Sequence, residues 1–289
     1  VTLTSIILYL SCIKLFFSGY VKSQGNIINT QHKFDNIDDC YKYVAKVSSR
    51  SCSSFPPPVT KKDSDDDYDD VRCNFPRTIG SNRVYAPREE IINSVNNNLR
   101  YFRIVYLDQR DATGHMIGIC GDYAIINTHY LQLPWGAIEV SQGKKKRNYR
   151  IFSRKSIKTL DCGGDLSLVK LSDYQFKDIR PLIYTHYDSY SRFDSYIDGH
   201  STRGSTISNV SILGGEVKYV INKAFTYIYP DNYDGACGKP YFISLNNGFY
   251  FAGIHSAIYG VEQCGYATYI GDIFEFIDTF DNSNMHYIY

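Results

Sequence analysis

Residues 101–270 form a succession of short runs rich in β-branched and aromatic residues, and this pattern limits the fold more than any other feature of the sequence. The runs include HMIGIC, YAIIN, LSLVKL, EVKYVI, FYFAGIH and YATYI, and turn-forming residues separate most of them. Short strands at this spacing are typical of all-β sandwiches and barrels. We therefore expect an all-β fold.

Two short helices are predicted at the ends of this region, in APREEIINSVNNNL and in GDIFEFIDTF. The first has a proline near its first turn, followed by acidic residues, as is common where a helix begins. Each helix has one apolar face, formed by Ile91, Ile92, Val95 and Leu99 in the first and by Ile273, Phe274, Phe276 and Ile277 in the second.

Composition excludes several classes of protein. A chain of 289 residues with 43% hydrophobic residues can bury one large core or two modest ones. A net charge of +1 argues against a protein that coats nucleic acid along its whole surface. The eight cysteines include no Cys-X-X-Cys pair and no Cys/His spacing typical of zinc, so we expect no metal, no other cofactor and no disulfide framework.

The chain before residue 86 divides into two segments. Residues 1–24 are an apolar leader, interrupted by Lys14, which we interpret as the end of a membrane anchor; a buried or amphipathic helix is the alternative. Residues 25–85 contain SRSCSSFPPP and TKKDSDDDYDDVR, and this composition predicts a flexible acidic linker. The folded domain is then residues 86–289.

Three residues that carry chemistry stand next to predicted strands, in the order His, Asp, Cys. His129 follows the strand in GDYAIINTHYL, Asp165 precedes the strand in GGDLSLVKL, and Cys237 lies in YDGACGKPYF. A cysteine nucleophile needs a base within hydrogen-bond reach and a third group to orient that base, and these residues supply such a set. Each also has a structural alternative: a packed histidine, a turn-capping aspartate and a small buried hydrophobe.

The glycines around the cysteine favour the catalytic interpretation. Gly235 and Gly238 allow a tight turn in which the amides around Ala236 and Cys237 point together at a developing oxyanion. A buried structural cysteine needs no such turn.

Over residues 86–280 the sequence resembles the picornavirus-type 3C-like proteases, which are cysteine proteases with two chymotrypsin-like antiparallel β-barrels. The resemblance rests on the Thr-His of INTHYL, on DLSLVKL, on GACG and on the Gly-X-His of GIHSA, in that order. FKDIRPL at 176–182 resembles the family's linker between the barrels, which places the junction at about 175–205.

The resemblance implies a role for each matched residue. His129 would be the general base, Asp165 the acid that orients it and Cys237 the nucleophile, while Asp161 and Glu139 remain rivals for the acid. Gly235, Ala236 and Cys237 would form the oxyanion hole. The residues that would bind substrate are Asn232, which replaces the family's threonine, Gly253 and His255.

The resemblance also implies partners and a location. Lys177, Asp178 and Arg180 fall on the family's RNA-binding motif, and the run KKKR at 144–147 either adds to a basic patch or is a solvated hairpin tip. The location would be the host cytoplasm, in a membrane-associated replication complex. In a viral polyprotein, the linker around Tyr68 either holds a small genome-linked peptide or is simply solvated chain.

The predicted activity is cleavage of a viral polyprotein after glutamine. A buried, neutral His255 would donate a hydrogen bond to a glutamine side chain and disfavour charged residues. Gln24 precedes Gly25 in VKSQGNI, so self-cleavage there is expected, whereas the Gln-Gly at 142–143 would be protected if it lies in a folded hairpin. The alternative is an RNA-binding module with a protease fold; a serine protease has no support, since Gly-Asp-Ser-Gly is absent.

Overall fold

The computed structural model describes residues 34–52, 86–142, 149–172, 174–190, 192–214, 217–229, 235–245, 248–259 and 263–282. The apolar leader, the acidic run around Tyr68, the Gln24–Gly25 bond and the KKKR run lie outside these residues. Among the described residues, no helix is long and apolar enough to cross a membrane.

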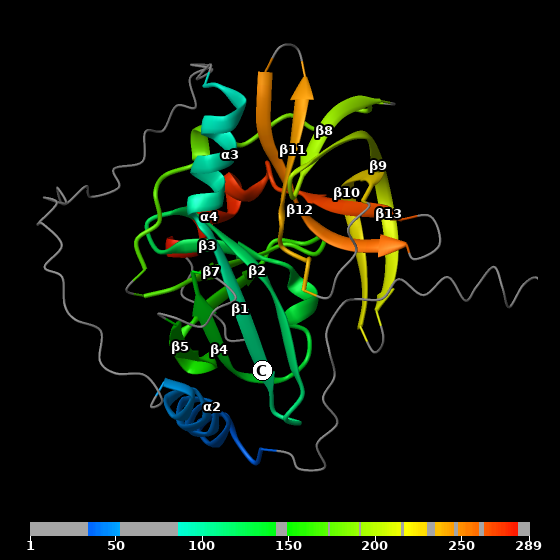
Figure 1. Ribbon diagram of the computed structural model, residues 1–289. Helices are drawn as coiled ribbons and strands as arrows, with labels where there is room; N and C mark the ends of the chain where they lie inside the picture. Colours follow the sequence, from blue (N-terminus) through cyan, green and yellow to red (C-terminus); the bar gives the residue numbers. More distant parts are fainter. Residues whose placement is uncertain are drawn as a thin grey trace, which may run out of the picture.

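The first half of the folded region is a seven-stranded antiparallel sheet that curls on itself (Figure 1). Its strand order is β5-β4-β1-β2-β3-β7-β6. The strands are β1 (Leu99–Tyr106), β2 (Asp111–Cys120), β3 (Tyr123–Ile126), β4 (Trp135–Ser141), β5 (Tyr149–Ser153), β6 (Lys158–Asp161) and β7 (Ser167–Lys170).

The second half is a closed antiparallel barrel of six strands in the order β10-β13-β12-β11-β8-β9. These strands are β8 (Phe193–Ile197), β9 (His200–Gly214), β10 (Val217–Ile228), β11 (Pro240–Leu245), β12 (Gly248–Tyr259) and β13 (Cys264–Tyr269). The predicted all-β fold with two antiparallel barrels and short flanking helices is confirmed.

The two barrels share a continuous apolar core at their junction. Ile117 and Ile125 of the first barrel lie in one buried cluster with Phe251 and Ile254 of the second. The chain between the barrels, 171–192, adds a parallel bridge from Ile183 to Phe251. The predicted junction at 175–205 begins in this connection but extends too far, because β8 and the start of β9 lie inside it.

Both predicted helices are present and pack on this shared core. Helix α3 (Arg88–Asn97) buries Ile91 and Val95, while Ile92 is only partly buried and Leu99 is the first residue of β1. Helix α4 (Ile273–Asn282) buries Ile273, Ile277 and Phe280, with Phe274 and Phe276 partly exposed at its side.

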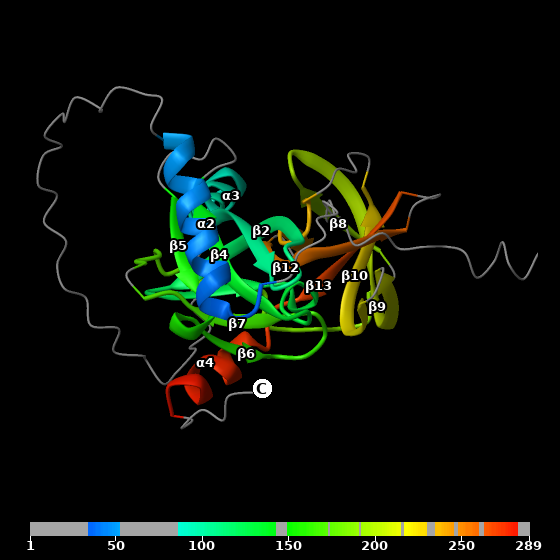
Figure 2. The same cartoon turned by 90° about the horizontal axis from the view of Figure 1, so that it is seen from below.

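The expectation of a flexible linker over 25–85 is wrong for one segment. Residues Ile37–Cys52 form helix α2, which lies against β4 and β5 on the outside of the first barrel (Figures 1 and 2). Cys40 and Val44, one turn apart, are buried against Val105 and Ala137. The helix forms because its apolar side chains recur at helical spacing, a pattern that the neighbouring serine, proline and aspartate runs obscure.

Candidate functional site

His129 is positioned by a buried strand that ends at the junction of the barrels. All four residues of β3 are buried, and the chain then makes a single 3₁₀ turn, η1 (Thr128–Tyr130). The turn directs the His129 side chain inward, where it is 5% exposed. The short apolar strand therefore fixes where the imidazole stands.

Asp165 reaches this imidazole because β7 pairs with β3. Ile126 is the register partner of Ser167, which brings the turn before β7 next to the turn after β3. Asp165 Oδ1 accepts hydrogen bonds from the His129 backbone N–H at 2.9 Å and from Nδ1 at 3.0 Å, and Oδ2 is also 3.0 Å from Nδ1. The carboxylate side chain is fully buried.

The turn that presents Asp165 has an unusual backbone. Gly163, Gly164 and Asp165 have φ values of 79°, 63° and 70°. A left-handed conformation is unfavourable for a residue with a side chain, although Asp tolerates it better than most. Such strain persists only where the surroundings over-determine it, and here the carboxylate is held by three N–H donors.

Neither rival carboxylate lies in this position. Asp161 is exposed and caps the turn by accepting from the Gly163 backbone N–H at 2.8 Å. Glu139 lies on β4 and is 3.7 Å from the guanidinium of Arg103. Of the three acids, Asp165 is the one in hydrogen-bond contact with His129.

Cys237 lies in a turn that is hydrogen-bonded to both barrels. Its carbonyl accepts from the His115 N–H of β2 at 2.9 Å, and the next N–H, of Gly238, donates to the His255 carbonyl of β12 at 2.8 Å. Gly235 and Gly238 have φ values of 86° and 85°, and a Cβ at Gly238 would lie 1.8 Å from the His115 carbonyl oxygen. Only glycine fits there.

The backbone amides that lead up to the sulfur are candidates for an oxyanion hole. Among the described residues, the N–H groups of Gly235, Ala236 and Cys237 have no acceptor. Three consecutive N–H groups of this kind form a concavity that suits an oxyanion.

The electrostatics of the site couple the imidazole to both neighbours. Burial alone would lower the pKa of His129, but the charge and hydrogen bond of Asp165, helped by Cys237, raise it to about 10. Nε2 is buried and has no hydrogen-bond partner within the described chain. The Cys237 thiol, 2% exposed, donates to the Ser256 carbonyl at 3.3 Å.

A second histidine lies on β12, beside this centre. His255 is 1% exposed, and its Nδ1 is 2.5 Å from the Tyr227 hydroxyl of β10. The ring of Tyr229 packs against the imidazole at 4.9 Å between centroids. Burial, with the charge of His129 as a smaller cause, lowers the pKa of His255 to about 3, so its ring is neutral at physiological pH.

A tyrosine from the β9–β10 hairpin lies on the His129 ring. The ring of Tyr219 stacks on His129, with centroids 5.1 Å apart and planes 19° apart, and its hydroxyl donates to the Ser256 carbonyl at 3.1 Å. Before Ala224 the described part of β10 pairs with β9 alone, since its pairing with β13 spans Ala224–Ile228. Tyr219 lies in this part of the strand, which pairs on one side only.

Comparison with solved structures identifies the architecture. A mutant of the tobacco etch virus protease superposes with a TM-score of 0.50 at 15% identity, covering 70% of this chain and 86% of that one. The fold is that of a chymotrypsin-like protease. The same viral protease in complex with product gives a TM-score of 0.49 at 15% identity, covering 68% of this chain and 82% of that one. A Mycobacterium tuberculosis protease gives a TM-score of 0.46 at 14% identity, covering 66% of this chain and 83% of that one. No family model and no curated protein matches the sequence.

Besides His255, the predicted substrate-binding residues are Asn232 and Gly253. Asn232 lies outside the described residues. Gly253 is buried within β12, where a Cβ would come 2.6 Å from the Thr268 carbonyl oxygen, so close strand packing already requires a glycine there.

The predicted RNA-binding residues lie in the connection between the two barrels. Arg180 is held by Asp178, with Nε–Oδ1 at 2.9 Å and Nη2–Oδ2 at 2.5 Å. The backbone of Lys177 is bound by the Asn98 side chain, while its own side chain is exposed. These three residues therefore belong to the connection, not to the turns that carry His129, Asp165 and Cys237.

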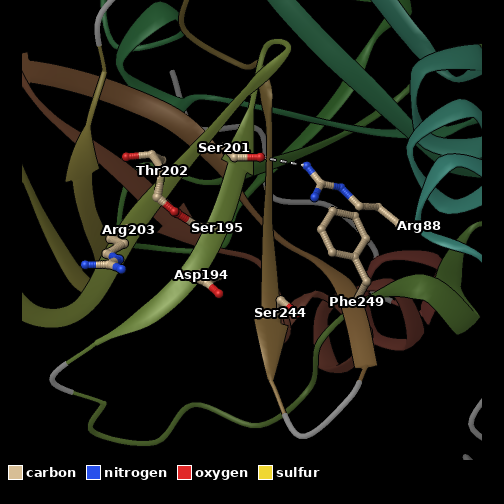
Figure 3. A pocket seen from close by; sticks show the side chains of 8 residues that line it. All are labelled: Arg88, Asp194, Ser195, Ser201, Thr202, Arg203, Ser244 and Phe249. Atoms are coloured by element: carbon tan, nitrogen blue, oxygen red, sulfur yellow. Dashed lines mark hydrogen bonds between the residues drawn. The ribbon is translucent and has the colours of Figure 1, made fainter.

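A surface pocket of about 360 Å³ lies elsewhere, on the second barrel beside the start of α3 (Figure 3). The guanidinium of Arg88 lies over the Tyr196 and Phe249 rings, at 4.5 and 5.2 Å, and donates to Ser201 Oγ at 3.1 Å. The lining side chains include no nucleophile with an adjacent base, so this pocket is not the catalytic centre.

Sequence reasoning missed several residues that contact the site, among them Asn127, Tyr219, Tyr227 and Ser256. Two of them precede or follow a predicted site residue, and adjacency to His129 and His255 was a usable signal. The two tyrosines lie in a strand far along the chain, and only the barrel closure brings them to the histidines.

Proposed function

We propose that this chain is a cysteine endopeptidase that cleaves a viral polyprotein, in the manner of the 3C-like proteases. The observation that carries the proposal is the contact of His129 Nδ1 with both carboxylate oxygens of Asp165, beside a cysteine in a turn of unpaired amides. This set supplies a base, an acid that orients it, a nucleophile and an oxyanion hole.

The mechanism follows from the position of each group. Asp165 accepts a hydrogen bond from the proton on Nδ1, so Nε2 is the nitrogen that takes the proton of the Cys237 thiol, and the raised pKa of His129 keeps that proton on the imidazole, beside a thiolate. The sulfur then attacks the scissile carbonyl, whose oxygen is bound by the amides of residues 235–237. The imidazolium returns its proton to the leaving amine, and water activated by the same imidazole releases the acyl group as a carboxylic acid.

The environment of His255 supports a preference for glutamine before the scissile bond. The Tyr227 hydroxyl lies 2.5 Å from Nδ1, and we assign it as the donor; the proton of the neutral imidazole then lies on Nε2 and is available for an amide oxygen. A glutamate carboxylate or a lysine ammonium would lose its hydration without a matching charge.

Two glutamine–glycine bonds of the chain are natural tests of this preference. Cleavage between Gln24 and Gly25 would separate the apolar leader from the protease. Gln142 directly follows β4, in the β4–β5 connection, and we propose that this bond is spared.

The experiment is incubation of the purified chain, followed by mapping of new amino termini by mass spectrometry. In the wild type we expect a new amino terminus at Gly25 and none at Gly143. In the Cys237→Ala variant the Gly25 terminus should be absent as well. A library of peptides should be cut after glutamine. Cleavage that survives in Cys237→Ala would refute the assignment of the nucleophile.

Binding of viral RNA and attachment to membranes through residues 1–21 remain predictions. The pairing of Arg180 with Asp178 leaves fewer free positive charges at the predicted RNA motif than the sequence suggests. Labelling of Cys237 by a peptide-based thiol probe supports the protease, whereas RNA binding without labelling would favour the alternative of an RNA-binding module.

A further inference from the structure

Asn127, the residue between β3 and η1, is fully buried behind the catalytic acid. Its Nδ2 donates to Asp165 Oδ2 at 3.0 Å and to the hydroxyl of Ser256 at 2.9 Å. Its own Oδ1 is buried without a hydrogen-bond partner among the described residues. Both amide protons are thus used on the site, and the acceptor is left unsatisfied.

This arrangement is unfavourable for a residue whose only role is structural. A buried polar atom without a partner costs free energy, and such atoms in native proteins call for a functional explanation. The orientation of the amide is nevertheless fixed, because its two acceptors are a carboxylate oxygen and a hydroxyl oxygen. The amide is therefore oriented by Asp165 and Ser256.

The same amide belongs to a closed polar circuit that joins the two barrels. Ser256 Oγ is 2.7 Å from Thr268 Oγ1, and Thr268 Oγ1 donates to the Gly164 carbonyl at 3.0 Å. Gly164 precedes Asp165, so the circuit returns to the acid. Ser256 and Thr268 belong to the second barrel, whereas Asn127 and Asp165 belong to the first.

The circuit controls the freedom of the Asp165 carboxylate. The His129 N–H and Nδ1 both bind Oδ1, and Asn127 is the further side-chain donor to Oδ2. Without that donor, only the His129 contacts hold the carboxylate within the described chain, so it is freer to turn about its Cβ–Cγ bond and the symmetric contact of both oxygens with Nδ1 is weakened.

We propose that Asn127 is a positioning residue that holds Asp165 in line with His129 and, through Ser256, ties that alignment to β12, the strand that carries His255. The inference rests on the proposed function, since it gives Asn127 a part in the same reaction. The triad is then correctly aligned only when the second barrel is docked with its substrate-binding strand in place.

The experiment compares three single variants of the full chain. Asn127→Ala removes the donor, Ser256→Ala removes the link to the second barrel, and Ser167→Ala is the matched control. Ser167 is equally buried, and its hydroxyl lies 2.8 Å from Thr128 Oγ1 without touching the Asp165 side chain.

With a glutamine-containing peptide, we expect Asn127→Ala to lower kcat between about 10-fold and 100-fold, the effect of a catalytic group displaced by about 1 Å. KM should change little, because Asn127 does not face the substrate. Ser256→Ala should lower kcat by less, and Ser167→Ala should resemble the wild type.

Titration of His129 by NMR gives a readout that needs no turnover. In Asn127→Ala the pKa of His129 should fall, because the Asp165 charge is no longer held against Nδ1; in Ser167→Ala it should not change. A wild-type kcat or an unchanged pKa of His129 in Asn127→Ala overturns the inference. If that variant does not fold, a wild-type kcat and pKa in Ser256→Ala overturn the link to β12.

The two proposals fail in different ways. A wild-type chain that cuts no peptide counts against the proposed function, while the titration still decides the role of Asn127.

Discussion

Replacing Asp165 by asparagine is the sharpest test of the catalytic assignment, because the structure predicts a conflict that no rotation of the new side chain resolves. The His129 N–H, the His129 Nδ1–H and the Asn127 amide all donate to the carboxylate. An asparagine has one acceptor oxygen and an NH₂ group in place of the other. If the NH₂ faces Asn127, two donors meet; if it faces Nδ1, the imidazole must shift its proton to Nε2.

The second arrangement destroys the base, since Nε2 then carries a proton and cannot accept one from Cys237. The same Asp→Asn change in a Ser-His-Asp triad lowers kcat about 10⁴-fold. A loss of that size corresponds to about 5 kcal/mol of transition-state stabilisation. We therefore expect Asp165→Asn to lose between about 10³-fold and 10⁴-fold in kcat.

The assay is the initial rate on a glutamine-containing fluorogenic peptide, with urea unfolding to verify that each variant is folded. Asp161→Asn and Glu139→Gln are the controls, and each should keep activity within a few-fold of the wild type, because neither carboxylate touches His129. If Asp165→Asn is folded and retains a tenth of the activity, or if Glu139→Gln loses as much, the assignment of the acid is wrong.

Four further outcomes are expected. Gly238→Ala should abolish cleavage and cost about 1–3 kcal/mol of stability, because φ is 85° and a Cβ would meet the His115 carbonyl; a wild-type rate would contradict this. Tyr227→Phe should weaken the preference for glutamine over glutamate about tenfold in kcat/KM, since His255 Nδ1 loses its donor, and an unchanged ratio counts against the role of His255. Tyr219→Ala should speed alkylation of Cys237 by iodoacetamide several-fold, whereas Tyr219→Phe, which keeps the ring, should change the rate less. Equal rates in the wild type and both variants would show that Tyr219 does not shield Cys237. Burial lowers the pKa of His255 to about 3, so between about pH 6.5 and pH 3 the unfolded chain binds a proton that the folded chain does not, and stability should fall on acidification through this range. His255→Gln should make the free energy of unfolding, measured by urea titration, depend less steeply on pH. An equal dependence in the variant argues against a neutral buried ring.

The strands that the sequence predicts are those that bury apolar side chains. β3 and β7 appear as apolar runs because nearly every residue is buried. β5 has one buried residue and β6 has none, so neither carries such a run, and β8 alternates buried residues with less buried ones in FDSYI; the sequence therefore indicates none of the three strands. Similarly, Asn222 and Lys223 interrupt the apolar pattern of β10, so the run EVKYVI covers only the first part of this strand.

The candidate site was predictable only where local chemistry reveals it. The glycines around Cys237 and the residue order His129, Asp165, Cys237 are visible in the sequence itself. The register between β3 and β7, which distinguishes Asp165 from Asp161, cannot, because it depends on strand pairing across nearly forty residues. The stacking of Tyr219 on His129 depends on a hairpin folding back from the other barrel.

Helix α2 restricts how far the chain can be shortened from its amino terminus. Cys40 fits against Gly136 so closely that a Cβ on that glycine would lie 2.5 Å from the sulfur, and the Phe34 N–H donates to the Leu107 carbonyl. A chain that begins at Gly25 keeps helix α2 and its contacts with the first barrel. Trimming anywhere between residues 53 and 85 would remove the helix and expose the apolar surface beneath it, which includes Val105 of β1 and Ala137 of β4. The folded region therefore needs part of the segment whose composition predicts a linker.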